Sequence, residues 1–337
     1  DYCCVHAALT LKDAGFEAIM INSNPETVST DFDVSSRLYF EPLTLEDILN
    51  VLEEENCNKI ILQFGGQTSI NLAVPLAKLG KTTKPRISIL GTQSDDIHRA
   101  EDRKLFSYLL KSLNIKHPAF GTGYTYEDVK TVAEQVGYPV IVRPSYVLGG
   151  RAMEIAYEPE GLEQYIETAA QVSKAHPVLV DKYIADAVEV DADALCDGRD
   201  VYVAGVMEHI EQAGVHSGDS YCVMPPYTLT PRTVNRIKSI TRKLAFALNT
   251  KGFINMQFAI KKDAIFVLEA NPRASRTIPY VSKTINVPLA TLATKIIIGE
   301  KLENLLKARQ RTPPKSKFVS IKGPTFPFMK LPGVDPI

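Results

Sequence analysis

The sequence predicts an α/β protein in which a doubly wound parallel-sheet domain precedes a small α+β unit and a larger, mainly antiparallel α+β unit. Three observations predict this fold. Helix-like and strand-like segments alternate from residue 3 to about 95, as in parallel sheets with crossover helices. Shorter elements with Gly- and Ser-rich material between them follow from residue 102 to about 186. Beyond residue 187, two strand-like runs are joined by a short turn, which is typical of an antiparallel hairpin.

In the first unit, apolar periodicity predicts helices over 3–14, 45–54 and 69–79, and strands over 18–22, 59–63 and 86–90. Two polar segments, Asn24 to Thr27 and Phe64 to Gln67, come directly after strands. Doubly wound folds bind ligands at this carboxyl edge of the sheet. Asn-Pro and Gly-Gly also form turns that need no ligand, so both interpretations stay open.

A boundary is expected near residues 91–102. The second unit is predicted to contain helices over 104–113 and 126–136 and strands over 139–142 and 178–183. The third unit contains strand-like runs over 187–194, 202–206, 253–260 and 265–270. The predicted division is therefore 1–98, 99–186 and 187–308, with a connecting segment over 309–337.

Composition favours an enzyme that acts on small molecules. The formal net charge of the 337 residues is −1 and charges of both signs are mixed, so no basic surface for nucleic acid or an anionic membrane is expected. No apolar run is long enough to span a bilayer. The five cysteines are spread without C-x-x-C spacing, which indicates reduced thiols in the cytoplasm, and Cys3-Cys4 lies in an apolar run that favours burial over redox activity. Both ends of the sequence resemble cut points, so we expect a piece of a longer protein.

The predicted hairpin over 253–270 brings metal-binding side chains together. Antiparallel pairing places Gln257 within about one residue of facing Glu269, and Asn271 points the same way as Glu269. Three hard oxygen donors on one face suit Mg²⁺ or Mn²⁺ beside phosphate. Arg273 and Arg276 follow at once and could hold an anion there. For an arbitrary hairpin, the alternative is a cross-strand ion pair of Glu269 with a lysine and two solvated arginines.

Further segments favour a nucleotide. The strand at 139–142 ends at Arg143 and leads to Gly149-Gly150, where backbone N–H groups could approach phosphates closely, although glycine pairs usually form turns. The strand at 178–183 leads to Glu189, and a polar loop runs from Glu208 to Ser220. Backbone groups, an apolar slot and a carboxylate are what adenosine requires. For His209 or His216 of this loop taken alone, a hydrogen bond to the backbone is the default explanation.

Together these segments resemble the ATP-grasp half-domains of the large subunit of carbamoyl phosphate synthetase. The resemblance rests on 143–151, 208–220, Gln257 and the Glu269-x-Asn271-Pro-Arg273 sequence, and it extends to the preceding domain through 1–6, 24–29, 63–67 and 99–103. It therefore covers nearly the whole chain, and it implies a pre-ATP-grasp domain followed by an ATP-grasp fold. Val147 to Arg151 and His209 to His216 resemble the second of the two homologous halves in that family.

The resemblance implies a role for each matching position. Arg103, Arg143, Gly149 and Gly150 would hold phosphates. Lys182, Ile184 and Glu189 would frame the adenosine, beside Gly214, Val215, His216 and Ser217. Gln257, Glu269 and Asn271 would bind two Mg²⁺ or Mn²⁺ ions, and Arg273 and Arg276 would face carbamate and the transferring phosphoryl group. His209 and Gln212 resemble positions near a monovalent cation, potassium.

The implied reaction is ATP-dependent phosphorylation of carbamate to carbamoyl phosphate, in pyrimidine and arginine biosynthesis. Carbamate is already an anion, so the protein must supply positioning and charge neutralisation rather than a strong base. The unit at 99–186 is expected to act as a lid that protects carbamate from water. The family's first synthetase half and glutaminase small subunit would be partners. The alternatives are another ATP-grasp carboxylate ligase or carboxylase, and a catalytically incomplete piece retained for assembly or regulation.

Overall fold

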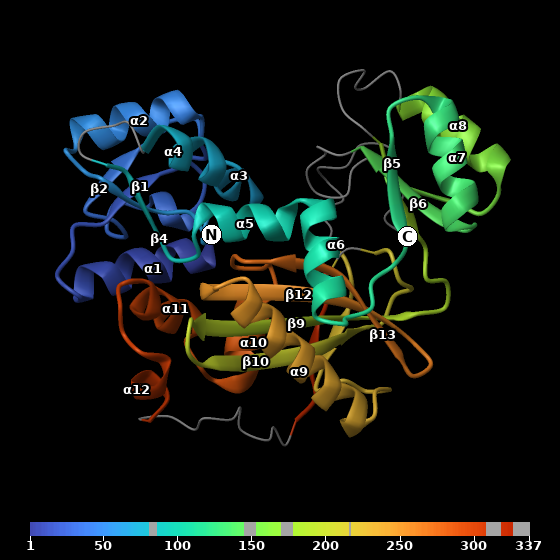
Figure 1. Ribbon diagram of the computed structural model, residues 1–337. Helices are drawn as coiled ribbons and strands as arrows, with labels where there is room; N and C mark the ends of the chain where they lie inside the picture. The colour runs from blue at the N-terminus through green and yellow to red at the C-terminus, as the bar shows by residue number, and fades with distance from the viewer. Residues whose placement is uncertain (81–85, 145–152, 170–177, 216, 308–317, 326–337) are drawn as a thin grey trace.

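The chain folds into three bodies (Figure 1). A computed structural model describes residues 1–80, 86–144, 153–169, 178–215, 217–307 and 318–325. A first α/β body lies at one end, a small lid-like body at the other, and the large sheet lies below and between them. Helix α5 (Ser94–Glu101) runs along the top of the large sheet, and α6 (Arg103–Ser112) turns down from its end to pack against that sheet. Together they connect the two smaller bodies. The segment expected to be a simple boundary is therefore largely helical.

The first body contains two pairs of parallel strands, as the predicted alternation requires. Strand β1 (Ile19–Ile21) pairs with β2 (Arg37–Tyr39), and β3 (Lys59–Ile61) pairs with β4 (Ser88–Leu90). The helices are α1 (Tyr2–Asp13), α2 (Leu45–Glu54), α3 (Gly66–Ile70) and α4 (Ala73–Gly80), with a short 3₁₀ turn at Val28–Thr30. The helix predicted over 69–79 is thus two helices. Strand β2 was not predicted, because a strand of three residues that begins with an arginine is too short to show an alternation of apolar and polar side chains.

The lid-like body is a four-stranded antiparallel sheet covered by two helices. Its strands are β5 (Phe120–Gly123), β6 (Val140–Pro144), β7 (Glu154–Ala156) and β8 (Val178–Lys182), in the order β5-β8-β6-β7. Helices α7 (Tyr126–Val136) and α8 (Pro159–Ala169) cover it. A capping box between Thr125 and Asp128 starts α7, and Gly137, with φ of +80°, ends it, so the predicted bounds match.

The large body is a six-stranded antiparallel sheet in the order β13-β12-β9-β10-β11-β14. Its long strands are β9 (Val188–Asp197), β10 (Val201–His209), β12 (Lys251–Lys261) and β13 (Ala264–Asn271), and its short ones are β11 (Cys222–Met224) and β14 (Ser320–Lys322). Helices α9 (Pro231–Ala247), α10 (Ile278–Ile285), α11 (Leu289–Ile297) and α12 (Leu302–Lys307) complete it. The antiparallel character was predicted, whereas these four helices were not.

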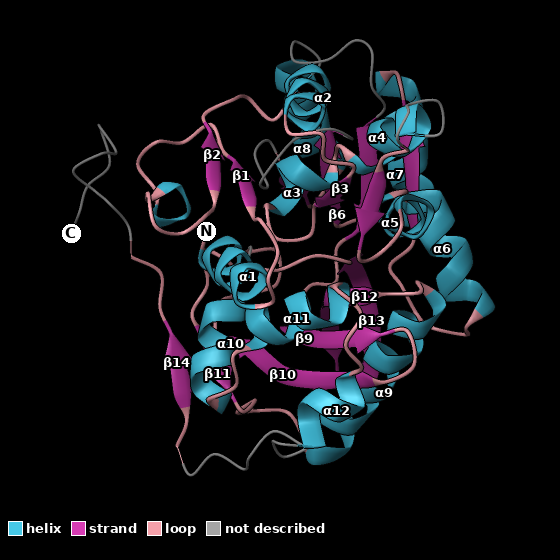
Figure 2. Cartoon of the chain, turned by 90° about the vertical axis from the view of Figure 1, so that its left-hand side faces the viewer, coloured by secondary structure: helices cyan, strands magenta, loops and turns pink. Residues whose placement is uncertain are grey.

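Each face of the large sheet has its own core. On one face, side chains of β9 and β12 such as Ala192 and Met256 pack with α6 and α9. On the opposite face, Leu195 and Phe253 pack with α10 and α11, and also with Cys3 and Ala7 of α1. Figure 2 shows α1, α10 and α11 gathered on this second face. The first body is therefore joined to the large sheet through a shared apolar core.

The cysteines behave as small buried side chains or unpaired thiols. All five are free, and Cys3 is buried. Burial raises the pKa of Cys3 to about 12, which leaves it a poor nucleophile. Cys4 donates to the carbonyl of Phe64 over 3.3 Å. Within the described residues, no helix is long and apolar enough to cross a membrane.

Candidate active site

The hairpin of β12 and β13 has the predicted register. Gln257 pairs with Glu269, and Asn255 pairs with Asn271. The amide of Asn271 donates to Oε1 of Glu269 over 2.9 Å, so these two side chains lie together on one face. Gln257, Glu269 and Asn271 therefore present amide and carboxylate oxygens from adjacent strands, a donor set that fits a hard divalent cation.

A β-bulge makes this arrangement possible. The pairing shifts between Gln257 and Phe258, so that β13 holds one extra residue at Leu268. Ile265 and Val267 belong to the core under α9, and so does Ala270. Strict alternation would place Glu269 on the same buried face as Val267. Because the bulge advances the alternation by one residue, Glu269 is directed to the opposite, polar face.

The arginines after the hairpin differ in their surroundings. Arg273 is half-buried, and its Nε donates to Oε1 of Gln67 over 3.1 Å while Nη2 donates to Oδ1 of Asn271 over 3.2 Å. Gln67 also donates to Glu101 over 2.9 Å. Arg276 is exposed. Among the residues described, Glu269 takes part in no ion pair. The alternative of a lysine ion pair is therefore not what the hairpin forms.

The polar segment at 64–67 lies where the first body meets this hairpin. Its neighbour Gln63 is 1% exposed and donates to Oγ1 of Thr92 over 2.6 Å and to the carbonyl of Lys251 over 2.9 Å. Oε1 of Gln63 accepts from the N–H of Phe253 over 3.3 Å, and its backbone carbonyl accepts from the N–H of Ala274 over 2.9 Å. This segment therefore holds the start of β12 and the arginine-bearing segment at once.

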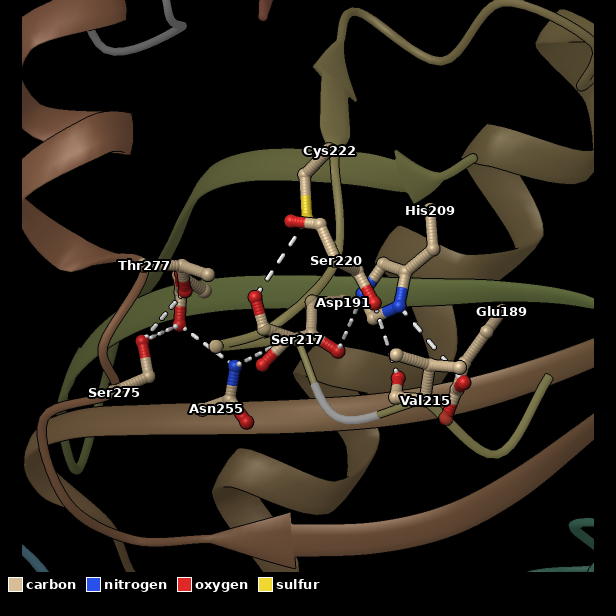
Figure 3. A network of polar contacts seen from close by, with 12 residues as sticks. Glu189, Asp191, His209, Val215, Ser217, Ser220, Cys222, Asn255, Ser275 and Thr277 are labelled. Carbon is tan, nitrogen blue, oxygen red and sulfur yellow. Dashed lines mark hydrogen bonds and ion pairs between the residues drawn. The ribbon is translucent and has the colours of Figure 1, made fainter. Parts of the chain in front are cut away.

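Strand β9 contributes three acidic side chains that were not all anticipated. Glu189 is nearly buried, and Asp191 and Asp193 are completely buried, on the face of the sheet that carries Gln257 and Asn255. Figure 3 shows Glu189, Asp191 and His209 facing one another across β9 and β10. Nε2 of His209 lies 3.4 Å from Oδ1 of Asp191, and Nδ1 lies 3.8 Å from Oε2 of Glu189. Acidic residues at every second position from 189 to 193 are the sequence signal that could have revealed this row.

Burial and mutual repulsion shift the protonation of these groups. Desolvation raises the pKa of Glu189 to about 7, with the charge of His209 acting against it. Desolvation also raises the pKa of Asp193 to about 6, against hydrogen bonds that lower it. The pKa of His209 rises to about 10; burial alone would lower it, and the carboxylate of Asp191 outweighs that effect. The cluster thus combines a protonated imidazole with carboxyl groups that titrate near neutrality.

The polar loop at 208–220 closes over this cluster. The N–H of Gly214 donates to Oε2 of Glu189 over 3.1 Å, and the hydroxyl of Tyr183 donates to the carbonyl of Ala213 over 2.9 Å. Ser217 is buried, whereas Gln212 and Val215 are exposed. Glu189 and the loop residue Gly214, both predicted to lie beside a nucleotide, are therefore in contact. The predicted site residues Gly149, Gly150 and His216 lie outside the described residues.

The two predicted phosphate-binding arginines converge on one carboxylate that was not predicted. Arg103 forms an ion pair with Oδ1 of Asp181, and Nη2 of Arg143 lies 3.6 Å from Oδ2 of the same residue. Arg103 also donates to the carbonyl of the bulged residue Leu268 over 2.6 Å. Arg103 thus links Asp181 on β8 of the lid-like body to the hairpin.

Lys182 and Ile184 lie at the end of β8, where the chain passes to the large sheet. The ammonium of Lys182 donates to the carbonyls of Gly137 and Tyr138 over 2.8 and 2.6 Å. Its side chain therefore holds the segment that follows α7, and Ile184 is half-buried.

Comparisons with known proteins agree with one another. The family model described as carbamoyl phosphate synthase preATP-grasp domain matches residues 1–99, and the model described as carbamoyl-phosphate synthase L chain, ATP binding domain, matches residues 102–305. The large chains of carbamoyl phosphate synthase from Methanothermobacter thermautotrophicus and Archaeoglobus fulgidus are 54% and 55% identical to this chain over all of it. The chain spans 31% and 30% of their length.

A third relative is shorter. The C-terminal section of the carbamoyl phosphate synthase large chain from Methanocaldococcus jannaschii is 54% identical over the whole chain, which spans 55% of that relative. Among solved structures, the biotin carboxylase domain of 2-oxoglutarate carboxylase from Hydrogenobacter thermophilus, in complex with MgADP, has a TM-score of 0.72 at 20% identity and covers 89% of this chain and 68% of its own. Biotin carboxylase from Campylobacter jejuni has a TM-score of 0.71 at 17% identity, covering 89% and 70%. These structures share the ATP-grasp fold.

Proposed function

Because the chain belongs to the carbamoyl phosphate synthase large-chain family, we propose that it is the second synthetase half and uses ATP to phosphorylate carbamate, giving carbamoyl phosphate. Similarity over the whole chain to a C-terminal section of such a large chain supports the second half. The observation that carries phosphoryl transfer is the hairpin, in which three oxygen donors share one face and two arginines follow directly.

The hairpin residues act by binding and orientation. Gln257, Glu269 and Asn271 hold two Mg²⁺ or Mn²⁺ ions, which when bound neutralise charge on the transferred phosphoryl group. Arg273 is oriented by Gln67 and Asn271, and faces the acceptor with Arg276. Carbamate carries its own negative charge, so no residue of this set has to remove a proton from it.

ATP lies between the lid and the large sheet in this proposal. Arg103 and Arg143 hold its phosphates together with Gly149-Gly150, and they exchange the carboxylate of Asp181 for phosphate oxygens. Lys182, Ile184 and Glu189 frame the adenosine, beside the loop of Gly214, Val215, His216 and Ser217. The lid unit at 99–186 closes over carbamate and excludes water.

A monovalent cation, potassium, fits the loop near His209 and Gln212. Oε2 of the intervening Glu211 is buried and has no hydrogen-bond partner among the described residues. An anionic oxygen left in that position is stabilised by a cation. In the full large chain, the first synthetase half and a glutaminase small subunit would supply the carbamate precursor, for pyrimidine and arginine synthesis.

The experiment supplies ADP, Mg²⁺ and carbamoyl phosphate and measures ATP formation. We expect ATP formation by the wild-type chain and a loss on the order of 100-fold or more in Glu269→Gln, because the anionic ligand is removed while the volume is kept. The matched control is Glu300→Gln, a partly exposed carboxylate 3.5 Å from Lys295 and away from the hairpin, which should keep wild-type activity. Equal ATP formation by wild type and Glu269→Gln would contradict the proposal.

Two other results would favour the alternative functions. Binding of ATP without turnover would indicate a catalytically incomplete piece retained for assembly or regulation. ATP hydrolysis that depends on a carboxylate substrate other than carbamate would indicate another ATP-grasp ligase or carboxylase.

A further inference from the structure

Asp193 on β9 is a completely buried carboxylate with three side-chain donors. Its Oδ1 accepts from Nδ2 of Asn255 over 2.9 Å and from Oγ of Ser275 over 2.8 Å, and its Oδ2 accepts from Oγ1 of Thr277 over 2.5 Å. Figure 3 shows Asn255, Ser275 and Thr277 converging from three positions of the chain. A buried carboxylate is costly unless it is fully hydrogen-bonded, and this one is.

Two of the donors come from the segment that carries the acceptor arginines. Ser275 and Thr277 lie between β13 and α10, and Arg273 and Arg276 belong to the same few residues. The hydroxyl oxygens of Ser275 and Thr277 also lie 2.7 Å apart, so the two side chains are packed against each other where both meet Asp193. Thr277 is completely buried, whereas Arg276 next to it is exposed. The buried hydroxyls therefore anchor a segment whose arginine extends outward.

The third donor connects Asp193 to the metal-binding strand. Asn255 pairs with Asp193 on one side and with Asn271 on the other, so the three residues form one row across β9, β12 and β13. Nδ2 of Asn271 lies 3.5 Å from Oδ1 of Asn255. Because the amide nitrogen of Asn255 donates to Asp193, its oxygen is left facing Asn271.

We propose that Asp193 is a positioning residue for the phosphoryl transfer proposed above. It fixes the segment 273–277 and, through Asn255, holds the metal ligand Asn271 at a set distance from that segment. It does not touch the substrates itself. The carboxylate suits this task because it only accepts hydrogen bonds, so all three donors must point at it. The inference rests on the proposed function, since a fixed distance between metal ligand and arginines matters only when the phosphoryl group passes between them.

The test measures ATP formation from ADP and carbamoyl phosphate in Asp193→Asn and Thr277→Val. Asparagine keeps the volume but turns one acceptor into a donor, and valine removes one anchoring hydroxyl. We expect the KM for carbamoyl phosphate to rise about tenfold or more in both variants, while the dissociation constant of MgADP stays within about twofold in Thr277→Val, which leaves the bond between Asn255 and Asp193 in place. The matched control is Thr294→Val, another completely buried threonine, whose hydroxyl donates to the carbonyl of Ala290 over 2.8 Å in α11. It should change neither constant.

The outcomes distinguish the proposed function from the positioning role of Asp193. If the wild-type chain forms no ATP, the proposed function fails and the positioning role falls with it. If the wild type is active but both variants keep its KM for carbamoyl phosphate, the positioning role alone is refuted. In Thr277→Val, a parallel rise in KM and in the dissociation constant of MgADP would indicate general loss of structure and would also refute it. Should Asp193→Asn fail to fold, Thr277→Val with its Thr294→Val control still decides.

Discussion

Replacing Gly252 with alanine tests how rigidly the first body is held to the large sheet. Gly252 has φ of +101°, and a Cβ built there lies 2.3 Å from Oε1 of Gln63 and 3.1 Å from Cδ1 of Ile297. Gln63 cannot swing away freely, because its amide is fixed by hydrogen bonds to Thr92, Lys251 and Phe253. The added methyl group therefore forces either the backbone or this amide to move.

Two contributions set the expected loss in the free energy of unfolding of Gly252→Ala. A non-glycine residue at this positive φ costs about 1 to 3 kcal/mol in backbone strain. Displacing the Gln63 amide leaves buried polar groups without partners, at about 1 to 3 kcal/mol. Gly252→Ala should therefore lower the free energy of unfolding by about 2 to 6 kcal/mol.

Urea unfolding followed by circular dichroism measures this cost. The control is Gly198→Ala in the turn between β9 and β10, where φ is +86° and an added Cβ meets nothing within 4 Å, so only the strain is expected. In a Gln63→Ala background, Gly252→Ala should also cost little more than the strain, because the atom that clashes is gone. The reasoning is refuted if Gly252→Ala and Gly198→Ala lower the free energy of unfolding equally.

Three further predictions concern the site and its support. Arg276→Ala should raise the KM for carbamoyl phosphate yet change the free energy of unfolding by less than about 0.5 kcal/mol in urea titrations, because this side chain is exposed. Leu195→Ala should cost about 2 to 5 kcal/mol in the same assay, since Leu195 is completely buried under α11. The pKa of Glu189 in the fold, about 7 against an ordinary 4.5, means that its protonated form stabilises the fold at low pH and that this stabilisation is lost as the pH rises through 7. The free energy of unfolding of Glu189→Gln should therefore rise by about 3 kcal/mol relative to that of wild type when the pH is raised from 4.5 to 8. A difference between the two proteins that does not change with pH would contradict the assigned shift.

The sequence was sufficient for the local parts of the site. Strands joined by a two-residue turn have little freedom of register, so a position of Gln257 within about one residue of facing Glu269 could be predicted from the hairpin alone. The bulge at Leu268 could not, because an extra residue leaves no signal in a strand whose two faces both carry apolar side chains. Helix α9 was missed although Thr230-Pro231 is a typical helix start and apolar residues recur at helical spacing to Leu244.

Contacts between distant segments account for the rest. Asp193 and Asp181 were overlooked because carboxylates are ordinarily exposed, and only tertiary structure shows that hydroxyl, amide and guanidinium donors surround them. Gln63 was predicted only as the last residue of a strand, whereas its side chain bonds to Lys251, which lies 188 positions further along the chain. No local pattern specifies such a partner.

The apolar core shared by α1 and α11 has a consequence for the order in which the protein can acquire its structure during translation. Cys3 and Ala7 leave the ribosome before their partners around Leu289 to Ala293, which lie more than 280 positions further along the chain. At typical synthesis rates this delay is roughly 15 to 60 s. During that interval the apolar side of α1 stays exposed, so α1 is a part of the nascent chain that a holding chaperone would be expected to cover.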